Sequence, residues 1–468
     1  MLIRKAEVAG QPEVDVRIEG ERVAAVGHRL PRAPGEPTVD ARDGALIPAL
    51  HDHHVHLRSL AASRSSVLLG PPDVADRAGF ATTLRRAASR TEPGGWIRGI
   101  GYHESVAGPL DRTVLDALVH DRPVRVQHRS GELWVLNSRA LAAIGEPTGP
   151  VSRGPCIERD GEGRATGRLW RADRWLATIV TPAPLDLDGV SRDAASLGVA
   201  GFTDADPERT QADVDALCAA AAAGTLRQRV VLMSAGGLAL EPGRAVQAGP
   251  RKILLDDVTL PAIDDLAATI AAAHARPEPV AVHCVTRVQL VVTLAALARA
   301  GPRPGDRIEH AAVVPPELRP EIRRLGVTVV TQPNFIAERG DQYRTDVDPA
   351  DVDLLYPCAT LRAAGVPVAG GTDAPFGRPE PWAAMRAATH RQATSGTVVG
   401  GHERVDGRTA LGLFLGRPDA PGVQRRIEEG TAADLCLLDR PLAAAVETLT
   451  PDLVVMTIAR GQIIADNR

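Results

Sequence analysis

The sequence predicts a (β/α)8 barrel combined with a small β-sandwich domain that the two ends of the chain form together. From about residue 195 onward, short β-rich runs alternate with amphipathic or alanine-rich stretches that are long enough for crossover helices. Such alternation is typical of a parallel sheet flanked by helices. The N-terminal segment and the tail contain instead short β-rich runs separated by turns, which indicates a separate β domain.

Eight candidate strands can be counted, and eight parallel strands close a barrel of this kind. The segments are 44–56, 198–205, 229–234, 252–257, 279–285, 306–312, 326–332 and 366–374. Candidate crossover helices occupy residues 264–275, 288–301 and 315–326.

The order of these segments predicts the domain organisation. We expect the barrel to span residues 44–404 and the β-sandwich to combine residues 1–43 with residues 405–468. A long insertion at about residues 57–195, rich in glycine, proline and arginine, separates the first two barrel strands. It holds four of the five tryptophans of the chain, namely Trp96, Trp134, Trp170 and Trp175. Because long loops after barrel strands usually carry function, we expect the insertion to shape a substrate pocket.

The composition favours a large globular domain with a smaller one beside it in the chain. The chain has 468 residues, 44% of them hydrophobic, which is enough to bury a barrel-sized core. The formal net charge of −4 comes from interspersed charges without a basic block, so neither nucleic acid nor a membrane is expected as a partner. No signal-peptide pattern or membrane-length apolar run is found, so we expect a cytoplasmic protein. The expected partner is a small-molecule substrate, and a homodimer is a further option.

The positions of the cysteines and of the two lysines bear on which sites the chain can form. The five cysteines (Cys156, Cys218, Cys284, Cys358 and Cys436) lack CxxC spacing, so we expect buried small side chains rather than disulfides or a four-cysteine zinc site. Among 54 basic Lys and Arg residues, only Lys5 and Lys252 are lysine. A lysine retained in the interior-looking segment around residue 252 indicates that its primary amine is needed there.

The run HDHHVH (51–56) is the first candidate metal motif. Strand side chains alternate, so Asp52, His54 and His56 share one face and two imidazoles can converge on one ion. A solvated or core-packed histidine cluster is the alternative interpretation. The position of the run at the carboxyl end of the first strand favours ligands, because functional side chains of barrels emerge there.

Three further candidates lie late in their own strands: His283 in the fifth, His310 in the sixth and Asp373 in the eighth. Taken singly, a histidine near a strand end is more often a packed residue than a ligand, and an aspartate before a turn is often an Asx-turn or a helix cap. Together with the first strand they form a nitrogen and oxygen ligand set suited to Zn²⁺, or to Mn²⁺, Fe²⁺ or Co²⁺.

These segments resemble the amidohydrolase superfamily. PALHDHHVHL resembles the family's PGxxDxHxHL opening, and VAVHCV, RIEHAAVV and AGGTDAPF resemble its later ligand segments. GGWIRGIGYHES, SGELWVLNSRALAAIG and RKILLDD resemble the branch of N-substituted formamide deformylases and YtcJ-like proteins. The resemblance implies one or two bound metal ions, with His54, His56, His283, His310 and Asp373 as ligands. It also implies that Lys252 is carboxylated and bridges two ions.

The chain departs from that branch at two segments. Ser130-Gly131-Glu132 replaces the usual DGH, and the segment from His283 to Arg287 replaces HAxGD. We therefore expect Glu132 and Arg287, with His103, to contact the substrate, although each is equally explained as a solvated loop residue.

The expected reaction is hydrolysis of a carbon–nitrogen bond in an amide, N-formyl or cyclic-amide substrate. A metal ion lowers the pKa of bound water and polarises a carbonyl, and Asp373 is the expected general base. A mononuclear deaminase of the same barrel class is an alternative, which Lys252 argues against. A catalytically inactive barrel acting as a binding protein is another, which the complete ligand set argues against.

Overall fold

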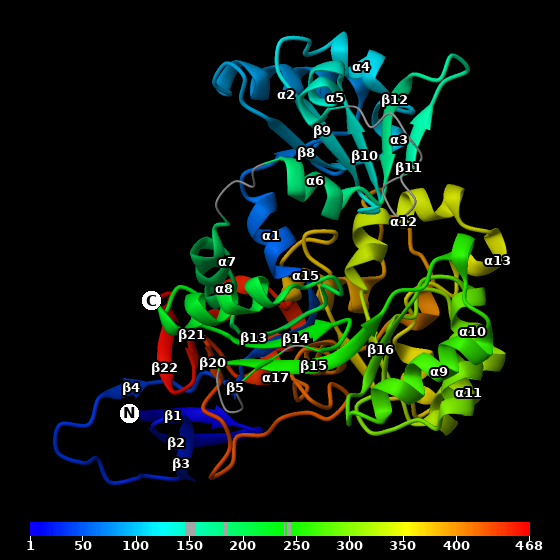
Figure 1. Ribbon diagram of the computed structural model, residues 1–468. Coiled ribbons are helices and arrows are strands. Elements are labelled where there is room, and N and C mark those ends of the chain that lie inside the picture. The colour runs from blue at the N-terminus through cyan, green and yellow to red at the C-terminus, as the bar shows by residue number, and fades with distance from the viewer. Residues whose placement is uncertain (146–155, 181–184, 238, 241–244) are drawn as a thin grey trace. The chain divides into compact units, whose positions relative to one another are not determined.

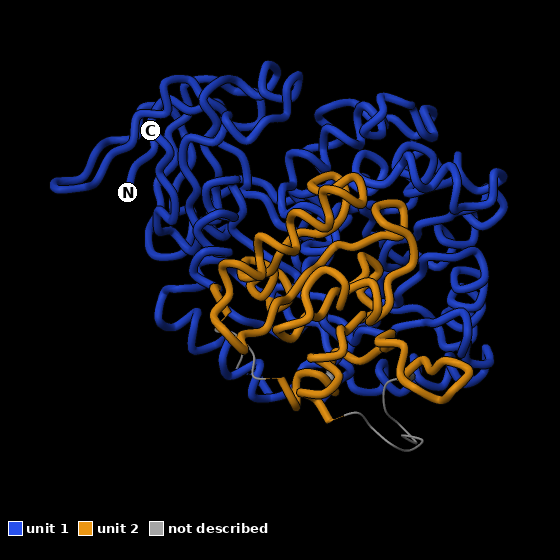
Figure 2. The backbone as a smooth tube through the Cα atoms, turned by 90° about the horizontal axis from the view of Figure 1, so that it is seen from above, with its two compact units in different colours: residues 1–57, 187–468 blue, residues 58–186 orange. Residues whose placement is uncertain are grey.

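The computed structural model describes residues 1–145, 156–180, 185–237, 239–240 and 245–468. Its chain forms two compact units, residues 1–57 with 187–468, and residues 58–186 (Figure 2). No helix among the described residues is long and apolar enough to cross a membrane.

The first unit contains the predicted barrel. Eight neighbouring strands pair in parallel in chain order, so the predicted fold class is confirmed. They are β6 (Leu50–Val55), β13 (Val199–Asp204), β14 (Arg229–Ser234), β15 (Val246–Ile253), β16 (Val280–Cys284), β17 (Arg307–His310), β18 (Thr328–Thr331) and β19 (Val368–Gly370). Beyond β19 the chain closes the barrel against β6, because the Asp373 N–H donates to the His54 carbonyl at 2.8 Å.

Helices connect the strands and cover the barrel, and the three predicted crossover helices are confirmed as α9 (Ile263–His274), α10 (Arg287–Ala300) and α11 (Arg319–Leu325). The Thr286 side chain caps the start of α10, and Gly301, at a φ of +78°, ends it. Figure 1 shows α9 and α10 beside β16. The other helices of this unit are α7 (Leu187–Ser196), α8 (Gln211–Ala222), α12 (Asn334–Asp346), α13 (Pro349–Val352), α14 (Ala359–Ala363), α15 (Pro381–His390), α16 (Gly407–Gly412) and α17 (Leu442–Thr448).

The fourth strand differs from the prediction of residues 252–257, because β15 begins at Val246 and ends at Ile253. The Gly249-Pro250 pair resembles a turn in the sequence but lies inside the strand. A Cβ at Gly249 would approach Val231 Cγ1 to 2.5 Å, so only glycine fits this contact. Pro250 lies where the pairing with β14 is irregular. Lys252 therefore lies at the carboxyl end of its strand and not at its start.

The two ends of the chain form the predicted composite sandwich. One sheet contains β1 (Leu2–Val8), β2 (Gln11–Glu19), β3 (Arg22–Gly27) and β4 (Thr38–Asp40). The other contains β5 (Leu46–Pro48), β20 (Leu435–Leu438), β21 (Val454–Ala459) and β22 (Gln462–Asp466). Ile3 and Val16 from the first sheet share one apolar core with Leu437 and Met456 from the second, so both ends of the chain stabilise one domain.

The second unit has a sheet and an apolar core of its own. The sheet order is β11-β12-β10-β9-β8-β7, with β7, β8 and β9 parallel and the remaining pairs antiparallel. The strands are β7 (Val67–Leu68), β8 (Ile97–Tyr102), β9 (Val124–His128), β10 (Leu133–Leu136), β11 (Cys156–Arg159) and β12 (Ala165–Trp170). The helices are α2 (Arg77–Arg90), α3 (Glu104–Ala107), α4 (Arg112–Asp116), α5 (Ser138–Ile144) and α6 (Asp173–Ile179), and α1 (Leu57–Ser63) begins at the boundary with the first unit.

Four cysteines can be described. Cys284, Cys358 and Cys436 are buried free thiols, as predicted, whereas Cys218 is only partly buried. The side chain of Cys156 lies outside the described residues.

Candidate metal centre

The side chains of Asp52 and His54, which alternate along β6, point toward the segment that follows β19. His54 is fully buried, and Asp52 beside it accepts hydrogen bonds from the backbone N–H and the hydroxyl of Thr372. These bonds fix the strand to the chain immediately before Asp373. The local packing therefore sets the position of Asp373 relative to His54.

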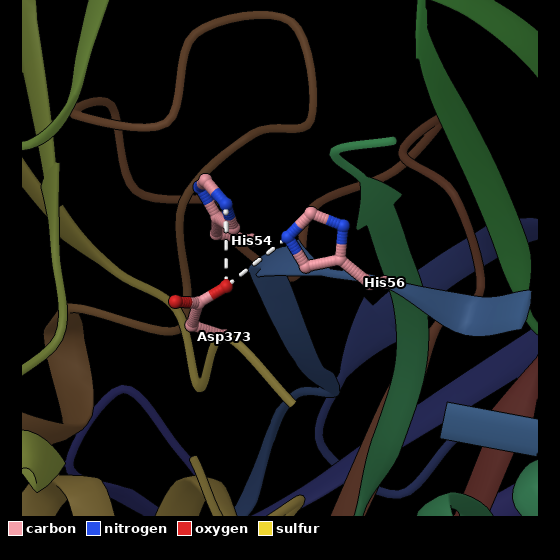
Figure 3. A group of neighbouring side chains, drawn as sticks. All are labelled: His54, His56 and Asp373. Atoms are coloured by element: carbon pink, nitrogen blue, oxygen red, sulfur yellow. Dashed lines mark ion pairs between the residues drawn. The ribbon is translucent and has the colours of Figure 1, made fainter. Parts of the chain in front are cut away.

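His54, His56 and Asp373 form a compact group at this position (Figure 3). Asp373 Oδ1 lies 3.2 Å from His56 Nε2 and 3.5 Å from His54 Nε2. His54 Nε2 and Asp373 Oδ1 are both buried and make no hydrogen bond within the described residues. Leaving two such atoms unsatisfied costs about 1–3 kcal/mol each, and a shared cation would satisfy both. The donor set thus fits a divalent metal ion.

The other two predicted histidines join this group. The His310 ring centroid lies 4.7 Å from that of His54 and 4.6 Å from that of His283. The structure therefore brings together the four imidazoles and the carboxylate selected from the sequence. His310 and Asp373 both have left-handed backbone, with φ of 67° and 56°. Non-glycine residues adopt this conformation at a cost, and such residues cluster at functional sites.

Hydrogen bonds at Nδ1 of His54 and His310 determine that Nε2 of each ring is the nitrogen available to a metal. His310 Nδ1 lies 2.8 Å from the Gln332 side-chain oxygen, and His54 Nδ1 bonds to the Glu309 carboxylate. Both oxygens only accept, so each Nδ1 carries the hydrogen and each Nε2 keeps a lone pair for a metal. Arg307 in turn donates to Glu309 from its Nη2 at 3.1 Å.

Sequence reasoning missed these supporting residues. Arg307 and Glu309 lie two residues apart in a strand predicted to be buried, immediately before His310. Two charges sharing one face of a buried strand indicate an internal ion pair, and that signal was available. The contact of Gln332 with His310 had no comparable signal.

The buried environment fixes the charges that metal binding requires. Burial, helped by the nearby Lys252 ammonium, lowers the pKa of His54 to about 4. Burial likewise lowers the pKa of His310 to about 3. Burial opposes ionisation of Asp373, but the adjacent imidazoles of His56, His54 and His310 hold its pKa below the usual value. Near neutral pH His54 and His310 are therefore uncharged and Asp373 is ionised, the forms that bind a metal.

Lys252 belongs to the same surroundings. Its side chain is 4% exposed, and burial lowers the pKa of its amine although the Glu309 and Asp373 carboxylates oppose the shift. Its charge in turn lowers the pKa of His283 and His310. A lowered pKa increases the fraction of neutral amine, which is the nucleophilic form.

The three expected substrate contacts lie in different places. Arg287, at the start of α10, pairs with Asp351 in the first unit. Glu132 belongs to the second unit, is exposed and lies 3.7 Å from Arg171. His103, also in the second unit, lies beside His128. Their roles toward the substrate stay predictions.

The comparison with known families decides the assignment. The sequence profile described as "Amidohydrolase family" matches residues 37–465, which is nearly the whole chain. The chain belongs to the amidohydrolase family. It is therefore a hydrolase of this family, and its barrel carries the ligands of a candidate metal centre.

Two named relatives match along nearly their whole length. An N-substituted formamide deformylase of Arthrobacter pascens is 26% identical over an alignment 511 residues long, covering 95% of this chain and 94% of the relative. YtcJ of Bacillus subtilis strain 168 is 23% identical over 485 residues, covering 92% of this chain and 91% of YtcJ. The resemblance to this branch of the family is thus confirmed.

Solved structures share the fold. An uncharacterized metal-dependent hydrolase from Pyrococcus furiosus superposes with a TM-score of 0.69 at 21% identity, covering 94% of this chain and 98% of the other. A second one, from Pyrococcus horikoshii OT3, gives a TM-score of 0.71 at 19% identity, with 99% of each chain covered. At these identities the likeness concerns the architecture.

Proposed function

We propose that this amidohydrolase is metal-dependent and hydrolyses a carbon–nitrogen bond in an amide, N-formyl or cyclic-amide substrate. The observation that carries the proposal is the pair of buried, unsatisfied atoms, His54 Nε2 and Asp373 Oδ1, which face one another within a cluster of histidines. The named relative that deformylates N-substituted formamides supports the bond type.

The ligands would be His54, His56, His283, His310 and Asp373, with Zn²⁺ as the first candidate and Mn²⁺, Fe²⁺ or Co²⁺ as others. Such an ion, when bound, lowers the pKa of water and polarises a carbonyl. The protein supplies the rest: Glu309 and Gln332 hold the His54 and His310 rings with Nε2 toward the group.

Asp373 is the proposed general base. Its lowered pKa keeps the carboxylate ionised near neutral pH, which is the form that can accept a proton. The same group can then return the proton to the leaving nitrogen. An amide requires this transfer because an unprotonated amine is a poor leaving group.

Lys252 is proposed to be carboxylated and to bridge two ions. Its neutral amine would attack the carbon of CO₂ and release one proton, which leaves a carbamate with two oxygens. The late position of Lys252 in β15, its burial and the lowered pKa of its amine support this step. Arginine has no comparably reactive amine and could not replace it.

A substrate screen combined with a metal assay tests the proposal. The zinc-loaded protein is assayed against N-acyl amines, N-formyl amines, cyclic amides, lactones and amidines. We expect hydrolysis of at least one class of carbon–nitrogen bond and its loss in the His54→Ala/His56→Ala double variant. His402→Ala, whose parent side chain is 51% exposed, is the matched control and keeps metal and activity. Full metal content in the double variant would contradict the site, and turnover of amidines alone would indicate a deaminase.

A further inference from the structure

Two similar tripeptides lie side by side in the second unit. His103-Glu104-Ser105 follows β8, and His128-Arg129-Ser130 begins with the last residue of β9. The two strands pair in parallel, with Tyr102 opposite His128, so their carboxyl ends share one edge of the sheet. The His103 and His128 rings consequently lie with centroids 5.7 Å apart.

Glu104 completes a group of three potential ligands. Its Oε2 lies 3.0 Å from His128 Nε2, and one ligand atom from each of His103, Glu104 and His128 lies within 4.8 Å of the others. Two ligands of one tetrahedral zinc ion lie about 3.4 Å apart, given bonds of about 2.0–2.2 Å. Small rotations of the side chains are therefore enough to bring all three atoms to one ion.

The serines hold both rings in the same way. His103 Nδ1 lies 2.9 Å from the Ser105 hydroxyl, and His128 Nδ1 lies 2.8 Å from the Ser130 hydroxyl. Each Nδ1 also accepts a hydrogen bond from the backbone N–H of the same serine. When an ion takes Nε2, the proton moves to Nδ1 and can be donated to the hydroxyl oxygen. Both serines are exposed, so water can then satisfy their backbone N–H groups.

We propose that His103, Glu104 and His128, all in the second unit, form a second divalent-metal site of the zinc class, which shares no ligand with the barrel centre. Two imidazoles and one carboxylate are a ligand set of open zinc sites, in which water or a small ligand takes the fourth position. The His128 and Glu104 side chains are 18% and 39% exposed, so the ion can exchange with solvent.

Zinc analysis of the full chain tests this site in a background that lacks the barrel ligands. The His54→Ala/His56→Ala variant is loaded with Zn²⁺, dialysed and analysed by mass spectrometry, and we expect one remaining equivalent per chain. Adding His103→Gln and His128→Gln should remove that equivalent. Adding His120→Gln instead, which changes an exposed histidine of the same unit, should leave it bound. If the variant that adds His103→Gln and His128→Gln retains as much zinc per chain as the variant that adds His120→Gln, the proposal is overturned.

Two further measurements do not depend on the folding of the histidine variant. X-ray absorption of zinc in the His54→Ala/His56→Ala background should show two imidazole ligands, and a spectrum of oxygen ligands alone would overturn the proposal. Replacing Ser105 and Ser130 with alanine should weaken zinc binding about 10- to 100-fold, as loss of an orienting contact does elsewhere. Unchanged affinity in the serine variant would show that these hydroxyls do not orient the rings for a metal.

Discussion

The contact between Glu309 and His54 leads to a specific prediction for Glu309→Gln. The carboxylate accepts from Arg307 on one side and from His54 Nδ1 on the other, and all three side chains are buried. Glutamine has the same shape but only one accepting oxygen. Its amide must therefore direct an N–H either at the Arg307 cation or at His54 Nδ1, and the second choice places the imidazole hydrogen on Nε2, where it blocks a metal.

The expected loss can be estimated from comparable sites. Removing a carboxylate that orients a histidine ligand typically weakens metal binding about 10- to 100-fold, which is about 1.4–2.7 kcal/mol. Removing the side chain altogether, as in Glu309→Ala, leaves Arg307 buried without its partner and should destabilise the fold by about 3–5 kcal/mol. Glutamine is therefore the informative substitution, and alanine reports mainly on folding.

Competition between the protein and a chelator for Zn²⁺ measures this effect, and thermal unfolding of the same samples checks the fold. Glu321→Gln is the matched control, because Glu321 pairs with Arg324 at the surface, with side chains 35% and 61% exposed. A surface pair contributes about 0–1 kcal/mol, so zinc affinity and stability should stay close to the parent values. Zinc affinity in Glu309→Gln equal to that of the control would refute the orienting role.

Three other predictions concern the same centre. Asp373→Asn should lower turnover about 100- to 10,000-fold with a smaller effect on substrate binding, because the amide cannot accept a proton; steady-state kinetics with near-normal turnover would remove the general-base role. Lys252→Ala should lose at least one metal ion and most activity, with partial recovery when a short carboxylic acid is added, whereas undiminished metal and rate in Lys252→Arg would exclude the carbamate. The lowered pKa values of His54 and His310, about 4 and 3, mean that the unfolded metal-free chain binds more protons below about pH 6.5. Stability of the chelator-treated protein should therefore fall as the pH drops from about 7 to 5, by up to about 2 kcal/mol for each histidine. Scanning calorimetry should show that the stability of the metal-free His54→Gln/His310→Gln variant depends less on pH than that of the metal-free parent. An equal dependence would contradict the lowered pKa values of these two histidines.

Much of the fold could be predicted because the barrel repeats a simple pattern. Crossover helix α10, for example, has a polar cap before it and a glycine after it, and strand β14 is a short, largely apolar run. This pattern gave the wrong bounds for β15, because Gly249 and Pro250 together resemble a turn in the sequence. In the structure, Gly249 is required by close packing against β14, and Pro250 lies where the pairing with β14 is irregular. Such contacts involve neighbouring strands, so a reading of one segment at a time cannot detect them.

The candidate ligands were predictable for a related reason. In a barrel, side chains late in the parallel strands all emerge at one rim. A histidine or aspartate at that place, as at His283, His310 and Asp373, can therefore be assigned from its position in a strand. The supporting contacts obey no such rule, since Glu309 and His54 are separated by 255 positions in the chain.

The barrel, the composite sandwich and the ligand types could be predicted from the sequence, because strand and helix periodicity and the end of each strand are local properties. Three-dimensional contacts were needed to establish which atoms are left unsatisfied, which nitrogen of His54 and of His310 faces the centre, and that Lys252 lies at the carboxyl end of its strand. It also joined His103, Glu104 and His128 at one sheet edge. Hydrogen-bond direction and burial depend on partners that are distant in the chain, and folding alone brings those partners together.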